Sequence, residues 1–440
     1  MYKKTKTKLL DLFNNNNDEK LKKIAKNVMI LFFGDFTASV FGILSMVITV
    51  KILGLEEYGW LVLVQTYVFI IDSLMNFQSW TALIKYGAGA LNNKDKKLFE
   101  NYIVHGFILD ICTAILGTIV AFTASDLIGK LLNWDETIIM AVKIYSFSIF
   151  SHISGTPIGI LRLLGKYKLF TFHKMGISII KFVILSISLF TGVDFYSILI
   201  ISLFIDILSN LILLMISIYV LYKNGIRAFN LRAFKLNYKF IKFSILNNLT
   251  TSIDIPVKQM DVFIISTVLS FELISVYKIF KNITNIFSRV ANQIYQVVFP
   301  ELALFIAKRE YKNAIKITIK ITSLILIVGI PITILVSATS KWWLLIIFDE
   351  TVSSYWVTFS LLLTIRMISS ALIAIHPLFI ALGYVKQNLY IVGFANVIYL
   401  FSAWFLGINF GLNGLAIAFG LQLIIVIYLK VVRIRRFSKK

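Results

Sequence analysis

Twelve hydrophobic stretches, most of them 20 residues or longer, follow one another along the chain. As a helix rising ~1.5 Å per residue, such a stretch crosses the ~30 Å hydrocarbon core of a bilayer. Within lipid only helices and closed barrels satisfy the backbone, and these stretches lack the alternation of barrel strands. With 58% hydrophobic and 15% charged residues, the chain is also more apolar than a soluble domain. We therefore predict an all-α polytopic membrane protein. Its twelve transmembrane helices are expected at residues 28–51, 59–80, 102–122, 138–161, 170–191, 196–222, 243–268, 276–299, 317–338, 355–380, 388–407 and 412–430.

The basic residues predict how the chain is oriented. The first 27 residues contain eight lysines, and every second connection between spans carries Lys or Arg. The remaining connections are short and acidic and contain only Lys130 and Lys341 as basic residues. Positive charge accumulates on the cytoplasmic side of membrane proteins. Both termini are therefore expected in the cytoplasm.

The two halves of the chain resemble each other. The fourth span of each half has a proline, Pro157 or Pro377, followed by Leu-Gly and a lysine. Parallel repeats place a substrate site at their interface, near the middle of the membrane. We therefore predict two pseudo-symmetric six-helix lobes around a central cavity. The predicted segments are a cytoplasmic basic tail (1–27), an N-terminal lobe (28–222), a cytoplasmic amphipathic basic linker (223–242), a C-terminal lobe (243–430) and a cytoplasmic basic tail (431–440).

One hydrophobic segment, residues 277–299, carries three cations. Its polar residues recur at intervals of 3, 4, 4, 3 and 4, which places them on one helix face: Lys278, Lys281, Asn285, Arg289, Asn292 and Gln296. A cation at the bilayer centre costs at least ~2.5–3.5 kcal/mol, so this face should line a wet cavity or contact other protein. We predict that it recognises an anionic group, because Arg offers a planar fork to phosphate and stays charged.

The preceding span, 243–268, has a second polar face, formed by Asn247, Thr251, Asp254, Lys258 and Asp261. Pro256 removes a backbone donor there and predicts a kink. Two roles are open for the acidic residues of this face. They could take part in ion coupling or gating, or they could neutralise the cations of the following span and hold the helices together.

The first half contributes two further membrane carboxylates, Asp35 and Asp72, which are candidates for binding a proton or sodium ion. The alternative is a salt bridge from each to the cations of span 276–299. Lys181 and Asp206 are expected to pair with each other, whereas Arg366 has no evident partner in the sequence. His152 and His376 are interpreted as buried, hydrogen-bonded histidines rather than proton relays.

Several classes of function are excluded or disfavoured. A single cysteine, Cys112, rules out an intrachain disulfide and any multi-cysteine metal site. The net charge of +22 resides in connections and tails, where it reports topology, so no nucleic-acid partner is expected. The chain also lacks a Gly-x-x-x-x-Gly-Lys-Ser/Thr phosphate loop. No cofactor is predicted beyond a coupling H⁺ or Na⁺.

The order of several short motifs resembles the bacterial polysaccharide flippases of the multidrug/oligosaccharidyl-lipid/polysaccharide flippase superfamily. These motifs are Gly54-Leu55-Glu56-Glu57-Tyr58-Gly59, Asp261-Val262-Phe263-Ile264-Ile265, Val276-Tyr277 and Phe299-Pro300. The resemblance implies two lobes flanking a cavity lined mainly by spans one, two, seven and eight. It implies transport of undecaprenyl-diphosphate-linked oligosaccharide repeat units (O-antigen, capsule or related polysaccharide) from the inner to the outer leaflet of the bacterial cytoplasmic membrane, coupled to an ion rather than to ATP.

The leading hypothesis is therefore a lipid-linked oligosaccharide flippase working by alternating access. Its expected partners are the lipid-linked glycan, membrane lipids, and a glycan polymerase with its chain-length machinery. The residues predicted to bind substrate are Arg289, Lys281, Lys278, Asn285, Asn292 and Lys258, and those predicted for ion coupling or gating are Asp35, Asp72, Asp254 and Asp261. The alternative is a drug or organic-cation antiporter of the same superfamily, which the cations of span 276–299 disfavour. A glycan polymerase or ligase is disfavoured because the external connections are too short for a catalytic domain.

Overall fold

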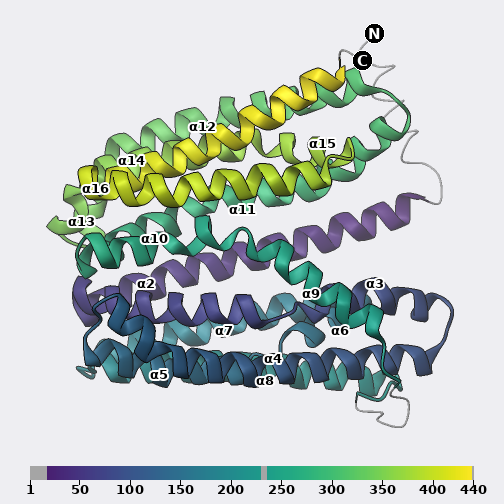
Figure 1. Ribbon diagram of the computed structural model, residues 1–440, viewed down its shortest axis with the longest axis horizontal. Helices are drawn as coiled ribbons and strands as arrows, with labels where there is room; N and C mark the ends of the chain where they lie inside the picture. Colours follow the sequence, from purple (N-terminus) through teal and green to yellow (C-terminus); the bar gives the residue numbers. More distant parts are fainter. Residues whose placement is uncertain (1–16, 229–234, 439–440) are drawn as a thin grey trace.

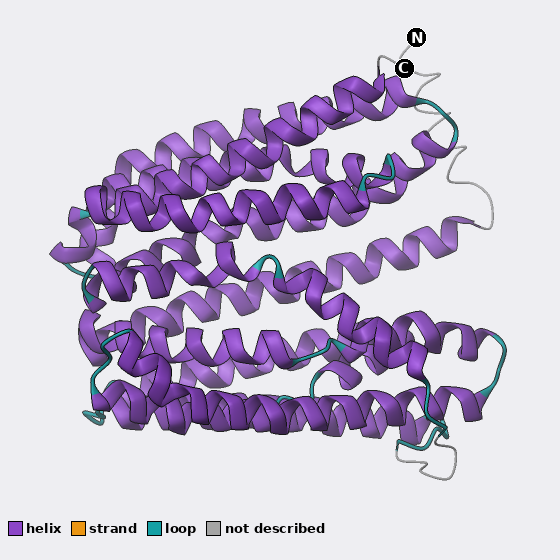
Figure 2. Cartoon of the chain, viewed as in Figure 1, coloured by secondary structure: helices purple, strands orange, loops and turns teal. Residues whose placement is uncertain are grey.

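The computed structural model describes residues 17–228 and 235–438, and these residues form helices joined by short turns (Figures 1 and 2). The prediction of an all-helical protein is confirmed for this part of the chain. The first helices are α2 (Asn17–Met75), α3 (Ser79–Asn92), α4 (Lys96–Leu131), α5 (Glu136–Phe150), α6 (Gly155–Leu163), α7 (Tyr167–Ser188) and α8 (Phe195–Lys223). They are followed by α9 (Tyr238–Ser252), α10 (Ile255–Val268), α11 (Phe271–Ala307), α12 (Tyr311–Ile347), α13 (Glu350–Ser354), α14 (Trp356–Ala371), a 3₁₀ turn (Leu372–Ala374), α15 (Ile375–Ala381) and α16 (Val385–Ser438).

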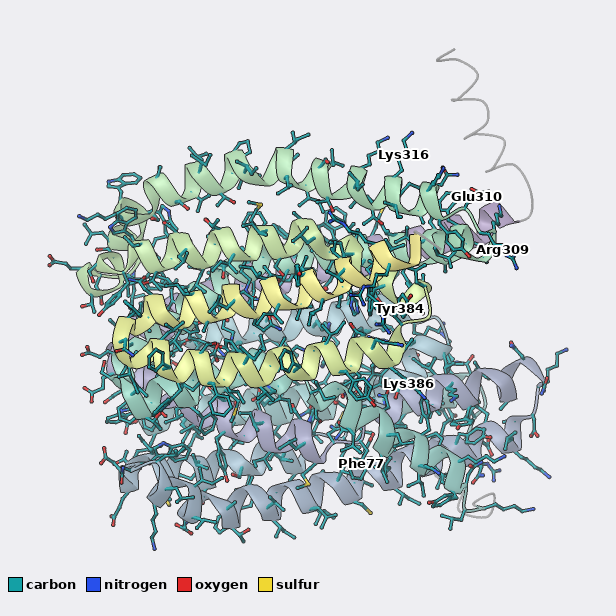
Figure 3. All side chains as sticks on the ribbon, turned by 45° about the horizontal axis from the view of Figure 1, so that its top comes forward. Phe77, Arg309, Glu310, Lys316, Tyr384 and Lys386 are labelled. Carbon is teal, nitrogen blue, oxygen red and sulfur yellow. The ribbon has the colours of Figure 1, made fainter. Side chains whose placement is uncertain are left out.

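The helices gather into two bundles that lie side by side along the long axis (Figure 1). Helices α2 to α8 form the first bundle, and α10 to α16 form the second. The main contact between the bundles is made by α2 against α11. The start of α2 and the end of α16 lie at the same end of the molecule (Figure 1). Arg309 and Lys386, from connections that the charge pattern assigns to the cytoplasm, lie toward that end too (Figure 3).

Eight of the described helical segments are long and apolar enough to cross a membrane, which makes this a multi-pass membrane protein. Helices α2 and α16 contain 59 and 54 residues, and each changes direction at a glycine with positive φ. Gly54, with a φ of 74°, turns α2, and Gly411, with a φ of 56°, turns α16. This conformation is readily accessible only to glycine. Helix α11 has 37 residues but is not among the eight segments. It carries the polar face predicted from the sequence, called here the basic stripe: Lys278, Lys281, Asn285, Arg289, Asn292 and Gln296.

Breaks inside several helical paths shape the centre of the molecule. The predicted kink at Pro256 is confirmed, because α9 ends at Ser252 and α10 restarts at Ile255. A second break separates α5 from α6, and there the Asp110 carboxylate accepts a hydrogen bond from the Thr156 amide at 2.7 Å. The carboxylate thereby satisfies a donor that the start of a helix leaves unpaired. Asp110 thus stabilises the break between α5 and α6, in which His152 lies.

The two pieces on either side of the 253–254 break belong to different bundles. Helix α9 packs against α3 and α4 of the first bundle, where the Phe240 ring lies 6.0 Å from Tyr86 and 5.8 Å from Tyr102. Helix α10 packs against α16 of the second bundle. The break itself is held by Asn396, whose side chain donates to the Ile253 carbonyl oxygen at 2.6 Å. One predicted span therefore crosses from the first bundle to the second.

The bundles also meet beyond the break, where α2 turns at Gly54 and α11 begins. The Ser275 hydroxyl donates to the Leu55 carbonyl oxygen, and the Trp60 ring lies edge-on to Phe271 at 6.4 Å. A Cβ on Gly59 would come within 2.1 Å of the Phe271 carbonyl oxygen, so only glycine permits this approach. The motif at 54–59 therefore makes the close contact between the bundles at this end.

Candidate functional site

The basic stripe of α11 faces a cavity of about 560 Å³, called here the cationic cavity. It is lined by Asp254, Val257, Lys258, Gln259, Lys278, Lys281, Asn282, Asn285, Ser288, Arg289, Asn292, Arg366, Asn396 and Gln422. All six residues proposed for substrate binding are among them. Gln296, the last residue of the stripe, has a side chain outside the described part. The helical spacing in the sequence thus predicted correctly which face of α11 lines a cavity.

Five basic side chains and one carboxylate, that of Asp254, line the cationic cavity. A second carboxylate lies behind its wall, because Lys281 forms an ion pair with Asp261, whose side chain is only 1% exposed. Lys281 also donates to the Lys258 carbonyl oxygen at 2.6 Å. Of the two roles open for the acidic residues of span 243–268, neutralisation of a neighbouring cation therefore fits Asp261. Asp254 pairs with Lys258 on its own helix at 3.3 Å.

Arg289 lies where several spaces meet. It lines the cationic cavity, and also a cavity of about 480 Å³ between the bundles that contains Asp35, His173 and Lys174. On a third side it borders a small apolar groove whose lining includes Phe32, Phe36, Val40, Ile286 and Val290. Its Nη1 donates to the Asp35 carbonyl oxygen at 3.4 Å, and the side chain is exposed. The guanidinium therefore borders both polar and apolar surroundings.

Arg366 reaches the cationic cavity from α14 of the second bundle. Its guanidinium lies 4.3 Å above the Phe419 ring, and its buried Nε has no hydrogen-bond partner among the described residues. Asn396 and Gln422, which bond to each other at 3.2 Å, line the same wall. In the sequence, Arg366 has no evident partner close along the chain. The helix packing supplies both its aromatic neighbour and its place in the cavity.

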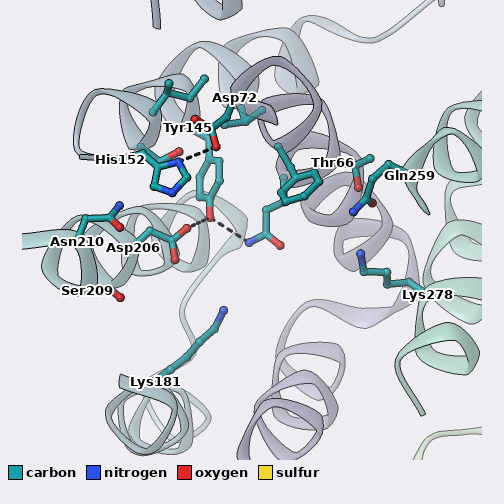
Figure 4. A pocket seen from close by; sticks show the side chains of 15 residues that line it. Thr66, Asp72, Tyr145, His152, Lys181, Asp206, Ser209, Asn210, Gln259 and Lys278 are labelled. Atoms are coloured by element: carbon teal, nitrogen blue, oxygen red, sulfur yellow. Dashed lines mark hydrogen bonds and ion pairs between the residues drawn. The ribbon is translucent and has the colours of Figure 1, made fainter. Parts of the chain in front are cut away.

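A second pocket, of about 490 Å³, lies mainly in the first bundle and is called here the first-bundle pocket (Figure 4). His152 bonds to the Asp72 carboxylate at 2.6 Å, and Tyr145 donates to Asp206 at 2.5 Å. The Gln65 amide also reaches the Tyr145 hydroxyl, at 3.4 Å. Lys278 and Gln259 line both this pocket and the cationic cavity, so the two spaces adjoin.

The predicted Lys181–Asp206 pair is wrong, and the two alternative salt bridges from Asp35 and Asp72 to the α11 cations are not formed between the described residues. Asp35 pairs with Lys174 at 3.0 Å and Asp72 with His152, so neither carboxylate makes an ion pair with the α11 cations. Asp206 bonds to Tyr145 rather than to Lys181, although both Asp206 and Lys181 line the first-bundle pocket. The interpretation of His152 as hydrogen-bonded is confirmed. These partners lie 61 to 139 residues apart in sequence, which is why spacing alone did not find them.

The site is not arranged for metal chemistry. Within the described residues, no three or more His, Cys, Asp and Glu side chains form a group that could hold a metal ion. What the cavities offer instead is a set of ammonium, guanidinium and amide donors, which suits the recognition of phosphate, carboxylate and hydroxyl groups.

The chain is similar to known proteins in sequence and in fold. The inner membrane protein YghQ of Escherichia coli (strain K12) is 27% identical over 152 residues, and the match spans 34% of this chain and 43% of that protein. An inward-facing multidrug resistance MATE family transporter of the MOP superfamily has the same fold. Its TM-score is 0.77 at 14% identity, and the superposition covers 92% of this chain and 96% of that chain. A MOP superfamily transporter from Pyrococcus furiosus gives a TM-score of 0.68 at 13% identity, over 95% and 97% of the two chains.

A family sequence profile matches the first bundle and the beginning of the second. It is described as "Polysaccharide biosynthesis protein" and matches residues 24–306, which include α2 through α11 almost entirely. The match therefore contains the α2 carboxylates, the 253–254 break and the complete basic stripe. Together with a fold shared with MOP superfamily transporters, this match shows that the chain is a member of the polysaccharide biosynthesis protein family.

Proposed function

We propose that this protein is a flippase for undecaprenyl-diphosphate-linked oligosaccharide repeat units in the bacterial cytoplasmic membrane. The chain would cross the membrane twelve times, because α2 and α16 each supply two crossings and α9 with α10 supplies one. The two lobes would be residues 28–222 and 243–430, with the basic tails and the linker at 223–242 on the cytoplasmic side.

The observation that carries the proposal is the cationic cavity. Five basic side chains line it against two nearby carboxylates, Asp254 and Asp261, which pair with Lys258 and Lys281, and a surplus of unpaired cations is costly within a membrane protein. Such a surplus is stabilised when an anion enters, since charges attract strongly where water is scarce. A diphosphate diester carries two negative charges and several acceptor oxygens. Arg289 and Lys278 are suited to bind it because, among the described residues, neither forms an ion pair.

The surroundings of Arg289 fit a ligand with a charged head and an apolar tail. The apolar groove beside it contains side chains of α2 and α11, and Phe36 and Val40 on this groove are both exposed. A diphosphate held by Arg289 would leave its polyprenyl chain along this groove or in lipid. Asn285 and Asn292, on the same stripe, would offer amide groups to the first sugars.

The transport cycle we infer is alternating access. The headgroup would enter from the cytoplasmic side, where the bundles separate, and leave after the contact between Leu55 and Ser275 opens. A proton moving on Asp35 or Asp72, or a sodium ion moving on Asp35, would reset the cycle. A glycan polymerase and its chain-length machinery would then consume the delivered unit.

The second candidate is a drug or organic-cation antiporter. The observation in its favour is the likeness of the fold to multidrug transporters. The cationic cavity argues against it, since five basic side chains repel an organic cation.

The deciding experiment replaces the chromosomal gene with the Arg289→Ala variant. Surface glycan is expected to fall at least about tenfold, because a charge-assisted contact of ~1.5–3 kcal/mol to the diphosphate is lost. The measurement is surface glycan per cell, normalised to the amount of protein in the membrane. Arg436→Ala, at an exposed arginine near the end of α16, is the matched control and should leave display unchanged. Normal display by Arg289→Ala at normal abundance would show that this arginine does not bind the headgroup.

A further inference from the structure

The first-bundle pocket is not needed for the diphosphate, and its chemistry differs from that of the cationic cavity. Its lining comes from α2, α5, α7, α8 and, through His152, the break between α5 and α6, and only Gln259 and Lys278 come from the second bundle. We propose that this pocket binds the sugar portion of the transported unit and selects units that carry an acidic sugar. This inference rests on the proposed function, because it assigns the sugar end of the same ligand.

Two lysines give the pocket its preference for a carboxylate. Lys181 enters from α7 and Lys278 from α11, and both ammonium groups point into the same space (Figure 4). Neither lysine forms an ion pair within the described part of the chain. A sugar carboxylate in this space would accept a charge-assisted hydrogen bond from a lysine ammonium group, which is the stronger kind. The neutral hydroxymethyl group of an ordinary hexose offers no such contact, and the Asp72 and Asp206 carboxylates of the pocket are already bonded to His152 and Tyr145.

The other polar side chains are already oriented for hydroxyl groups. His152 holds the Asp72 carboxylate and Tyr145 holds Asp206, which fixes both carboxylates and leaves oxygen lone pairs facing the pocket. Asn210 is fixed in the same way, by donating to the Ser151 hydroxyl at 3.1 Å. Phe69 adds an apolar ring to the lining. Rigid acceptors and donors around an aromatic surface are what recognition of a sugar ring requires.

The same features argue against a site for a metal cation. Both carboxylates already accept hydrogen bonds, and two ammonium groups share the space and would repel sodium. The volume of about 490 Å³ also lies in the range of pockets for organic ligands. Because Gln259 and Lys278 line both spaces, the pocket adjoins the cationic cavity, and a ligand that occupies both would pass beside Lys278.

The test uses the full-length protein in nanodiscs and three probes. Undecaprenyl diphosphate reports on the headgroup, and cellobiuronic acid and cellobiose differ only by a carboxylate in place of a hydroxymethyl group. Wild-type protein should bind the acidic disaccharide about tenfold more tightly than the neutral one. Lys181→Gln should reduce this ratio to about twofold or less while leaving the affinity for undecaprenyl diphosphate unchanged. Lys181→Arg should restore the preference.

Two further variants serve as controls. Asp206→Asn should weaken binding of both disaccharides and keep their ratio, because it alters a hydroxyl contact and not the carboxylate contact. Lys143→Gln removes a lysine that pairs with Asp126 at 2.8 Å, away from the pocket, and should change nothing.

The outcomes separate the two proposals. Wild-type protein that fails to bind undecaprenyl diphosphate would refute the proposed function. Binding of undecaprenyl diphosphate without preference for the acidic disaccharide, or a preference that Lys181→Gln retains, would refute this inference alone. Sodium binding that Asp206→Asn abolishes, with no disaccharide binding, would make the pocket an ion site and would likewise refute the inference.

Discussion

At the scale of single residues, the protein handles its membrane cations in two different ways. Lys281 is sequestered, since its side chain is 12% exposed and paired with a nearly inaccessible Asp261. Arg289 and Lys278 remain available along the same stripe. The helical spacing of these residues in the sequence does not indicate this difference, because the carboxylate that pairs with Lys281 comes from another helix. The sequence therefore predicted the face correctly but not the role of each member.

The Lys281–Asp261 pair leads to a stability prediction. Asp261→Ala leaves a buried ammonium group without its partner and should lower the free energy of unfolding by about 3–5 kcal/mol. The double variant Asp261→Leu with Lys281→Met should recover most of this loss, because apolar residues replace both charges. Thermal unfolding of the purified protein in detergent measures both effects. A single variant as stable as wild type would mean that Lys281 finds another partner or loses its proton.

At the scale of helices, the breaks between helices position polar side chains of the two cavities. The break between α5 and α6 places His152 against Asp72, and the break at 253–254 places Asp254 on the cationic cavity. Proline signalled the second break in the sequence. The span predicted at 317–338 extends as α12 to Ile347, because neither proline nor glycine interrupts residues 339–347.

The division of α9 and α10 between bundles predicts which helices move together. Gln78 at the start of α3 donates to the Thr251 hydroxyl of α9 at 2.8 Å. In a Cys112→Ser background, a Gln78→Cys and Thr251→Cys pair joined by a short bis-methanethiosulfonate, which links two thiols through reducible disulfides, should keep at least about half of the surface glycan display. The reason is that the crosslink lies within one moving unit. Display abolished by this crosslink would show that α9 separates from the first bundle during transport.

At the scale of the whole molecule, composition and hydropathy were enough to predict a helical, multi-pass membrane protein. The division at the 223–242 linker is only approximate, because α9 follows that linker yet packs with the first bundle. Such crossing could not be read from hydropathy, which marks where a helix lies but not which neighbours it contacts. In the sequence, the motif at 54–59 indicates a family resemblance but not a contact. The structure shows that it makes a contact between the bundles.

That contact gives the prediction for the complete transporter. A Leu55→Cys and Ser275→Cys pair, joined by the same reagent in the same background, should abolish glycan display, because it locks one end of the passage shut. Reducing the crosslink should restore display, which separates locking from misfolding. The Gln78 and Thr251 pair serves as the matched control for labelling. Undiminished display by a fully crosslinked Leu55 and Ser275 pair would contradict an exit at this end.

The broken helix also limits how far the two bundles can travel. Only residues 253 and 254 join α9, anchored by its aromatic rings on one side, to α10, anchored on the other. Two residues of extended backbone reach about 7 Å, so the bundles stay tethered at this level however widely their ends spread. The axis of any rotation of one bundle against the other must then pass near residues 253 and 254. Asp254 lies close to that axis and would keep its neighbours during the rotation, whereas residues farther from the axis would change theirs.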